Sequence, residues 1–459
     1  MQRNPILPLI YHIPDAEARV MSDGKLYLYG SLDEEENQYC SERYHVASTT
    51  DMEQWTVHEN IFSAEQVPWA SGGSVEKKSR FENITCAEEL PEYIRERLSE
   101  EELKNFDAKK FLAGVKSVTN KNAPQKALLY APDAIEKNGS YYLYFCLSDE
   151  TEGVAVANKP EGPFENAKKL PATGIDPSVF VDDDGCIYYY WGQFRANVVK
   201  LNPDMLGFEK KDVHEGVLTE KEYFFHEGSS IRKRGNVYYY VYTGISGGKP
   251  TTLEYATSDS PLGPFTYQGV IIDNCECDPE SWNNHGSIEE FQGQWYIFYH
   301  RSSQGTSSMR RVCAEPIYFD ENGKILPVVM TSQGAGKPFS LDEYIPSYTA
   351  CGLKGSVCLK PSNNKKYQEE SAQNFSDKSS LFFRYLSGEK EASVCTVYSC
   401  GECEIRIFLN ENLAVEGKIS PQSERTIFYL KEIKLAERYE IMIQVNNPCE
   451  FELIGIEFH

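Results

Sequence analysis

The stretch that decides the fold begins Phe224-Phe225-His226-Glu227-Gly228-Ser229-Ser230 and continues into Gly235-Asn236-Val237-Tyr238-Tyr239-Tyr240. A turn glycine followed by alternating aromatic residues is typical of a hairpin that enters a buried strand. A glutamate held among aromatic side chains is costly to ionise, as a catalytic acid requires. Glu227 is therefore a candidate acid, and a paired structural carboxylate is the alternative.

The same hairpin signal occurs five times along the chain. Its turn glycines are Gly24, Gly139, Gly185, Gly235 and Gly293. The last three intervals are 46, 50 and 58 residues long, which is room for four short strands each. Radial repetition of four-stranded sheets is a β-propeller, so we predict an all-β chain with a five-bladed propeller at residues 1–333.

The first interval, of 115 residues, is far longer than the others. The excess predicts an insertion at about residues 71–126, for which a lid, an oligomer contact and a plain surface excursion are all open. After the linker 334–338 the aromatic rhythm stops and alternating strands follow, as at 403–409 and 439–445. Residues 348–459 are therefore expected to form a small β-sandwich.

The charge and composition of the chain limit the classes of molecule that it is expected to bind. The net charge of −23, from 69 acidic and 46 basic residues, argues against nucleic acid and anionic membranes and suits a neutral ligand such as a sugar. No run of about eighteen apolar residues could span a bilayer. Thirteen scattered cysteines and an N-terminus without a signal peptide lead us to expect a reduced, cytoplasmic protein.

The first strand of each blade lines one central channel, so residues at a fixed offset from the turn glycines should converge there. Counting back nine, six, nine, eight and eight residues reaches Asp15, Asp133, Asp176, Glu227 and His285. Four carboxyl groups and a histidine at nearly constant offset favour a functional channel over solvated surface charge. For Asp133, a turn residue after proline is the structural alternative.

These segments resemble glycoside hydrolase family 43, the five-bladed propeller enzymes that cut arabinose and xylose linkages, over residues 13–328. The resemblance implies that Asp15 is the general base, that Asp133 tunes the acid's pKa and that Glu227 is the general acid. Asp176 is assigned to the structural polar network of the channel. An inverting reaction places base and acid about 6.5–9.5 Å apart. Asp15-Ala16 and Glu227-Gly228-Ser229 depart from the family's Asp-Pro and Glu-Gly-Pro, which leaves the subfamily open.

The same resemblance implies further site residues. Arg310 matches an arginine that hydrogen-bonds the sugar, although Arg311 is an alternative match. Trp69 and Phe194 are candidates for stacking on a sugar face, with core packing equally open. His285 matches a channel histidine that contacts a structural calcium ion or its water shell. No cofactor is expected to be required for the chemistry.

We therefore predict an inverting exo-glycosidase that hydrolyses terminal α-L-arabinofuranosyl or β-D-xylosyl residues of plant-cell-wall-derived oligosaccharides. The alternative is a non-catalytic carbohydrate-binding propeller, against which the three acidic positions argue. Residues 403–458 loosely resemble a family 6 carbohydrate-binding module. They show no pair of Trp or Tyr placed to clamp a glycan, so docking against the propeller is the preferred role of this region.

Overall fold

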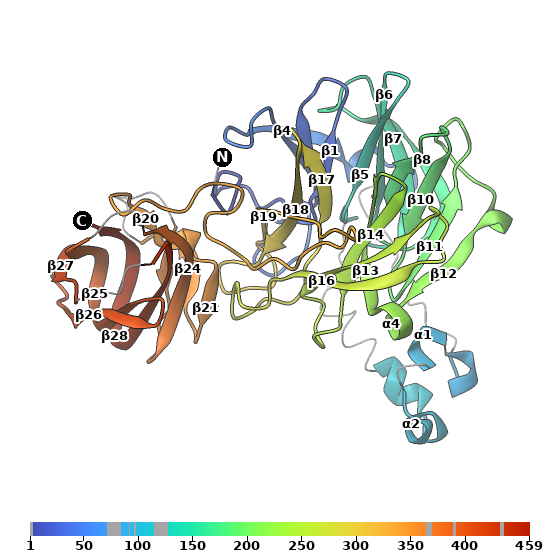
Figure 1. Ribbon diagram of the computed structural model, residues 1–459. Coiled ribbons are helices and arrows are strands. Elements are labelled where there is room, and N and C mark those ends of the chain that lie inside the picture. Colours follow the sequence, from blue (N-terminus) through green and yellow to red (C-terminus); the bar gives the residue numbers. More distant parts are fainter. Residues whose placement is uncertain are drawn as a thin grey trace.

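The computed structural model describes residues 3–70, 84–90, 92–95, 98–113, 127–363, 370–388, 392–431 and 436–459, and most of these residues lie in β-sheets. Figure 1 shows sheets grouped around one axis, with the C-terminal strands, coloured orange to red, on one side of them. The predicted all-β, five-bladed propeller is confirmed by five separate antiparallel sheets within the described part of the chain.

Each of the five sheets is built from strands that follow one another in sequence. The first blade holds β1 (Glu17–Val20), β2 (Leu26–Tyr29), β3 (Arg43–Thr49) and β4 (Thr56–Ser63). The second holds β5 (Asp133–Lys137), β6 (Ser140–Cys146), β7 (Thr151–Ala157) and β8 (Glu165–Thr173). The third holds β9 (Ser178–Val181), β10 (Ile187–Trp191), β11 (Arg195–Lys200) and β12 (His214–Thr219). The fourth holds β13 (Phe225–Arg234), β14 (Val237–Gly244), β15 (Thr252–Ser258) and β16 (Thr266–Asp273). The fifth holds β17 (Ser287–Phe291), β18 (Gln294–Arg301) and β19 (Arg311–Pro316).

The aromatic alternation explains how neighbouring blades pack. In β14 the ring of Tyr239 lies in a core shared with the fifth blade, whereas Tyr238 and Tyr240 lie in a core shared with the third blade. Successive side chains of a strand point to opposite faces of its sheet, so one tyrosine run fills both interfaces. The first strand of each blade lies innermost, and a parallel bridge between Ala16 and Gly286 closes the ring.

Short helices accompany the strands. They are α1 (Glu92–Arg95), α2 (Glu100–Lys104) and α4 (Glu220–Tyr223). The first two belong to the predicted insertion 71–126 and project from the propeller in Figure 1, while residues 71–83 and 114–126 of that insertion lie outside the described residues. No helix in the described part of the chain is long and apolar enough to cross a membrane.

The C-terminal strands form one continuous sheet that curls around its own core. They are β20 (Ile345–Pro346), β21 (Gly352–Lys354), β22 (Cys358–Pro361), β23 (Glu370–Gln373), β24 (Ser379–Ser387), β25 (Val394–Leu409), β26 (Asn412–Ile419), β27 (Arg425–Tyr429) and β28 (Arg438–Phe458). The long strands β25 and β28 pair with register shifts, and such bulges bend a sheet back on itself.

The curled sheet is joined to the propeller by specific contacts. The backbone N–H of Gln304 donates to the carbonyl of Leu359 at 2.8 Å, and that of Leu353 donates to the carbonyl of Glu276 at 2.8 Å. Arg311 at the start of β19 forms a two-pronged, buried ion pair with Glu370 of β23. The loop between β18 and β19 is therefore held by residues of the curled sheet.

Candidate active site

A pocket of about 240 Å³ opens beside the ends of the innermost strands. Its acidic and basic lining residues are Asp15, Asp176, His226, Glu227, His285 and Arg310. Asp15 and Asp176 directly precede the first strands of their blades, and both have left-handed backbones, with φ of 58° and 57°. Such strained conformations are concentrated at functional sites. Four of the five residues predicted to converge do so.

Asp133 is the exception, and its predicted place beside Glu227 is not what the structure shows. The carboxylate is fully buried below the pocket, where it accepts hydrogen bonds from Arg19 Nε at 2.9 Å and from the backbone N–H of Val179 at 2.7 Å. The physical reason is its offset of six residues from the turn glycine, against eight or nine for the others. The residues eight and nine before Gly139 are Ala131 and Tyr130, and these do line the pocket.

Asp15 is held in its charged form by the groups around it. Its Oδ1 accepts a hydrogen bond from Arg310 Nη1 at 2.7 Å, and its Oδ2 accepts one from Ser31 Oγ at 2.6 Å. His300 Nδ1 lies 3.3 Å from Oδ1. Burial raises the pKa of Asp15, but the Arg310 guanidinium and the His300 contact more than offset it and hold the pKa well below its usual range. A carboxylate that stays ionised is suited to accept a proton.

Arg310 owes its position to an acidic residue that the sequence reading overlooked. Asp33 accepts hydrogen bonds from Arg310 Nε at 2.9 Å and Nη2 at 3.0 Å, as well as from its backbone N–H at 3.0 Å. This bidentate pairing fixes the plane of the guanidinium. Of the two predicted arginines, Arg310 lines the pocket, whereas Arg311 points away and pairs with Glu370.

Glu227 enters the pocket at a bulge in β13. Glu227 pairs with Thr243 and Ser230 with Val241, so β13 has one residue more than β14 between these pairs. Gly228 has a φ of 74°, and a Cβ at this position would lie 2.6 Å from Thr243 Oγ1 and 3.0 Å from the His285 ring. A bulge re-aims the neighbouring side chain. Gln193 Nε2 donates to Glu227 Oε2 at 2.8 Å, which leaves Oε1 for a ligand.

Asp176 is the carboxyl group that interacts electrostatically with Glu227. Burial raises the pKa of Asp176 well above its usual value, and the charges of Glu227 and Asp15 raise it further. Its Oδ2 lies 3.7 Å from His285 Nδ1. Burial also lowers the pKa of His285, which favours the neutral imidazole. Two carboxyl groups that resist ionising together can keep a proton in the pocket.

The two aromatic residues predicted to stack on sugar do not line this pocket. The Trp69 indole stacks on Phe145 with ring centroids 6.0 Å apart and donates a hydrogen bond to Thr151 Oγ1 at 2.9 Å. It therefore packs within the second blade. Phe194 lies edge-on to His226, with centroids 5.2 Å apart, and so supports a lining residue from behind. Core packing, the alternative for both, is what the structure shows for Trp69, whereas Phe194 is half-buried beside His226.

The residues around His285 do not fit a directly coordinated calcium ion. Calcium takes six to eight oxygen ligands. In the ranges that the structure describes, no group of three or more His, Cys, Asp and Glu side chains is arranged to hold a metal ion. Asp15 is already engaged by Arg310 and Ser31, and the raised pKa of Asp176 makes it a poor anionic ligand.

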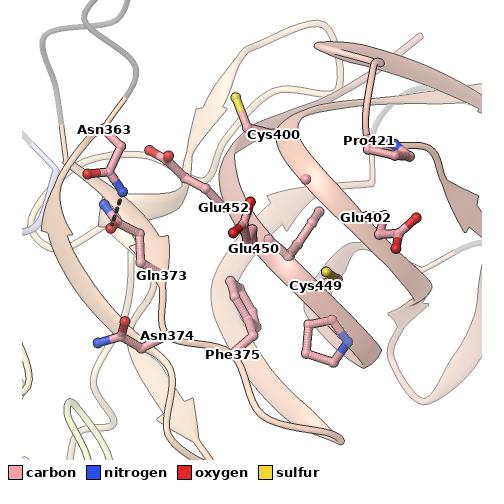
Figure 2. A pocket seen from close by; sticks show the side chains of 13 residues that line it. Asn363, Gln373, Asn374, Phe375, Cys400, Glu402, Pro421, Cys449, Glu450 and Glu452 are labelled. Carbon is pink, nitrogen blue, oxygen red and sulfur yellow. Dashed lines mark hydrogen bonds between the residues drawn. The ribbon is translucent and has the colours of Figure 1, made fainter.

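A larger hollow, of about 910 Å³, lies in the curled sheet and is shown in Figure 2. Its described lining residues include Glu402, Glu450 and Glu452 together with Asn363 and Gln373. The propeller pocket, by contrast, combines the ionised Asp15 with Asp176, a carboxyl group whose pKa is raised well above its usual value. The catalytic candidate is therefore the smaller pocket of the propeller.

Comparison with known proteins supports this assignment. The model of glycosyl hydrolases family 43 matches residues 101–325. A xylosidase/arabinosidase of Thermoclostridium stercorarium is 30% identical over 396 residues, which cover 76% of this chain and 72% of the relative. A xylosidase/arabinosidase of Bacteroides ovatus is 33% identical over 244 residues, covering 44% and 73% respectively.

Solved structures point the same way. The family 43 β-xylosidase/α-arabinofuranosidase CoXyl43 from a compost metagenome, in complex with xylotriose, is 27% identical with a TM-score of 0.53 and covers 72% of this chain and 98% of its own. A family 43 enzyme of Xanthomonas citri complexed with xylotriose is 27% identical with a TM-score of 0.53, covering 71% and 93%. The family match includes the pocket residues Asp176, Glu227 and Arg310. The chain is a glycoside hydrolase and belongs to glycosyl hydrolase family 43.

Proposed function

We propose that this enzyme is an inverting exo-glycosidase that releases terminal α-L-arabinofuranosyl or β-D-xylosyl residues from plant-cell-wall-derived oligosaccharides. The observation that carries the proposal is the pairing within one pocket of an ionised carboxylate, Asp15, with a second carboxyl group, Glu227, whose neighbour Asp176 resists ionisation. The relatives named xylosidase/arabinosidase support the choice of pentose.

In this proposal Asp15 is the general base. A water molecule attacks the anomeric carbon while Asp15 takes one of its protons, and the remaining hydroxyl stays on the sugar. The low pKa of Asp15 keeps it ionised at neutral and mildly acidic pH. Arg310 and Ser31 fix the orientation of the carboxylate, so no reorganisation is needed as the water approaches.

Glu227 is the general acid. It donates its proton to the glycosidic oxygen as the bond to the anomeric carbon breaks, so the leaving sugar departs as a neutral alcohol. Glu227 ends ionised and Asp15 protonated, and exchange with solvent restores both. Asp176, rather than Asp133, is assigned the role of keeping a proton available to this pair, because its carboxyl group interacts with Glu227 inside the pocket.

Two further expectations belong to this proposal. The enzyme is expected to work in the cytoplasm, and its thirteen scattered cysteines suit a reducing compartment. The curled C-terminal sheet is expected to act chiefly by docking on the propeller, and its resemblance to a carbohydrate-binding module stays a prediction.

Hydrolysis assays test the proposal against the carbohydrate-binding alternative. Wild type, Asp15→Asn and Glu227→Gln are compared on aryl arabinofuranoside, aryl xyloside and short xylo-oligosaccharides. We expect the wild type to turn over and each variant to lose roughly 10²–10⁴-fold in kcat on the oligosaccharides. A folded wild type that binds these sugars without hydrolysing any of them would favour the binding propeller. Full activity in either variant would remove the role given to that residue.

A further inference from the structure

Trp282 is an exposed aromatic side chain in the wall of a pocket whose other lining residues are buried or half-buried. The residue is 54% exposed and lines the pocket, whereas Asp15, Asp176, His285 and Arg310 are each at most 6% exposed. Within the described residues no aromatic ring stacks on the indole, and its N–H has no hydrogen-bond acceptor. Large exposed aromatic side chains that do not support a core are typical of binding surfaces.

The backbone beneath Trp282 is rigid. The carbonyl of Asn283 accepts hydrogen bonds from Asn274 Nδ2 at 2.9 Å and from His300 Nε2 at 3.0 Å. The N–H of Asn284 donates to the carbonyl of Pro250 at 2.8 Å. The indole is therefore presented from a fixed turn, so stacking of a ligand on it costs little conformational entropy of the chain.

The same turn is attached to the strand that carries the general acid. Thr243 is the strand partner of Glu227, and its hydroxyl donates to the carbonyl of Asn284 at 2.5 Å. Trp282 precedes Asn284 by two residues, and it lines the same pocket as Glu227. The general acid faces the glycosidic oxygen, and the leaving sugar must therefore lie beside Glu227.

The volume of the pocket distinguishes the place of the terminal pentose from that of the next sugar in the oligosaccharide. A volume of about 240 Å³ is below the roughly 300–1,000 Å³ of clefts that hold drug-sized ligands. The buried floor accommodates one pentose ring, and the next ring of the oligosaccharide lies at the exposed rim. We propose, building on the function proposed above, that Trp282 is the stacking platform for this second sugar and sets the preference for oligosaccharides over simple glycosides.

The experiment compares two substrates that share a terminal sugar, xylobiose and β-D-xylopyranosyl fluoride. The fluoride's leaving group is one atom and cannot reach the rim. For Trp282→Ala we expect kcat/KM on xylobiose to fall about tenfold, as for a lost aromatic contact, while kcat/KM on the fluoride stays within about twofold of wild type. Trp282→Phe keeps an aromatic face and should restore most of the xylobiose activity.

Tyr318→Ala is the matched control, because Tyr318 is a 58% exposed aromatic residue of the propeller outside the pocket lining. This variant should change kcat/KM on neither substrate. If Trp282→Ala lost kcat/KM equally on both substrates, or lost none on xylobiose, the proposal that Trp282 is a stacking platform would be overturned. A wild type that cleaves aryl arabinofuranoside but neither xylosyl substrate would overturn the platform for xylo-oligosaccharides and leave the proposed function standing. A wild type inactive on all three substrates would overturn the proposed function, so the two failures are distinguishable.

Discussion

Asp176 and Glu227 share a pocket in which two negative charges are costly. Because the pKa of Asp176 is raised by burial and by the Glu227 carboxylate, the pair retains a proton as the pH rises above the usual carboxyl range. Activity is lost when that proton leaves. Asp176→Asn removes the repulsion, so the alkaline limb of the kcat profile should move to lower pH by about one unit or more.

The matched control is Asp184→Asn, which changes an exposed carboxylate in the hairpin of the same blade. Its pH profile should coincide with that of the wild type. An unmoved alkaline limb in Asp176→Asn would contradict the coupling, and an equal shift in Asp133→Asn would return the tuning role to Asp133. The acidic limb of the kcat profile should stay in place in Asp176→Asn and in Asp133→Asn, because this limb depends on the ionisation of Asp15.

At the level of single residues, the sequence predicted most of the pocket but not its supports. The repeated offset found Asp15, Asp176, Glu227 and His285, because strand period and blade repeat together fix which side chains face the channel. Asp133 was misplaced although its shorter offset was visible in the sequence. Asp33 and Trp282 lie in loops, and His300 lies on the second strand of its blade, β18, so the repeated offset marked none of them.

At the level of elements, the bulge in β13 aims Glu227. Gly228→Ala places a Cβ against Thr243 and His285 in a left-handed backbone, so either the bulge opens or its neighbours move. We expect a loss of about 1–3 kcal/mol in the free energy of unfolding and at least a tenfold loss of kcat. Denaturant titration and steady-state kinetics measure the two effects.

Gly235→Ala separates backbone strain from loss of aim. Gly235 also has a positive φ, of 60°, but a Cβ there meets nothing within 4 Å. This variant should lose stability to a similar degree and keep its kcat. If Gly228→Ala kept full kcat as well, the bulge would have no part in positioning the acid.

The strands themselves could be predicted, whereas their irregularities could not. Runs such as Val237–Gly244 predict a strand, because alternating aromatic residues fill the interfaces on both sides of a blade. A bulge depends on a close approach between segments far apart in sequence, as between Gly228 and His285. The curled form of the C-terminal sheet likewise depends on register shifts within β25 and β28, which alternation alone does not reveal.

At the level of the whole molecule, the curled sheet braces the loop that delivers Arg310. Arg311 and Glu370 are each at most 5% exposed, and their ion pair spans the two parts of the chain. Glu370→Gln leaves Arg311 with an uncompensated buried charge, which typically costs about 3–5 kcal/mol. We expect a loss of that order in denaturant unfolding and a fall in kcat, because Arg310 is the adjacent residue.

Glu276→Gln is the control at the same interface. Its partner Lys354 lies 3.3 Å away, and both side chains are about half exposed. Such exposed pairs contribute about 1 kcal/mol or less, so this variant should unfold and react much as the wild type does. A Glu370→Gln enzyme that is destabilised but keeps its kcat would show that the ion pair supports the fold alone.

That Asp15 activates water while Glu227 protonates the leaving oxygen across one pocket is tested most directly by the configuration of the released sugar. Proton NMR of the wild-type reaction, recorded before mutarotation, resolves the two anomers of the first product. Hydrolysis of a β-D-xyloside should release α-xylose first, because water attacks the face opposite the leaving group. Initial release of β-xylose would contradict the assignment, since retention requires a carboxylate that attacks the sugar itself.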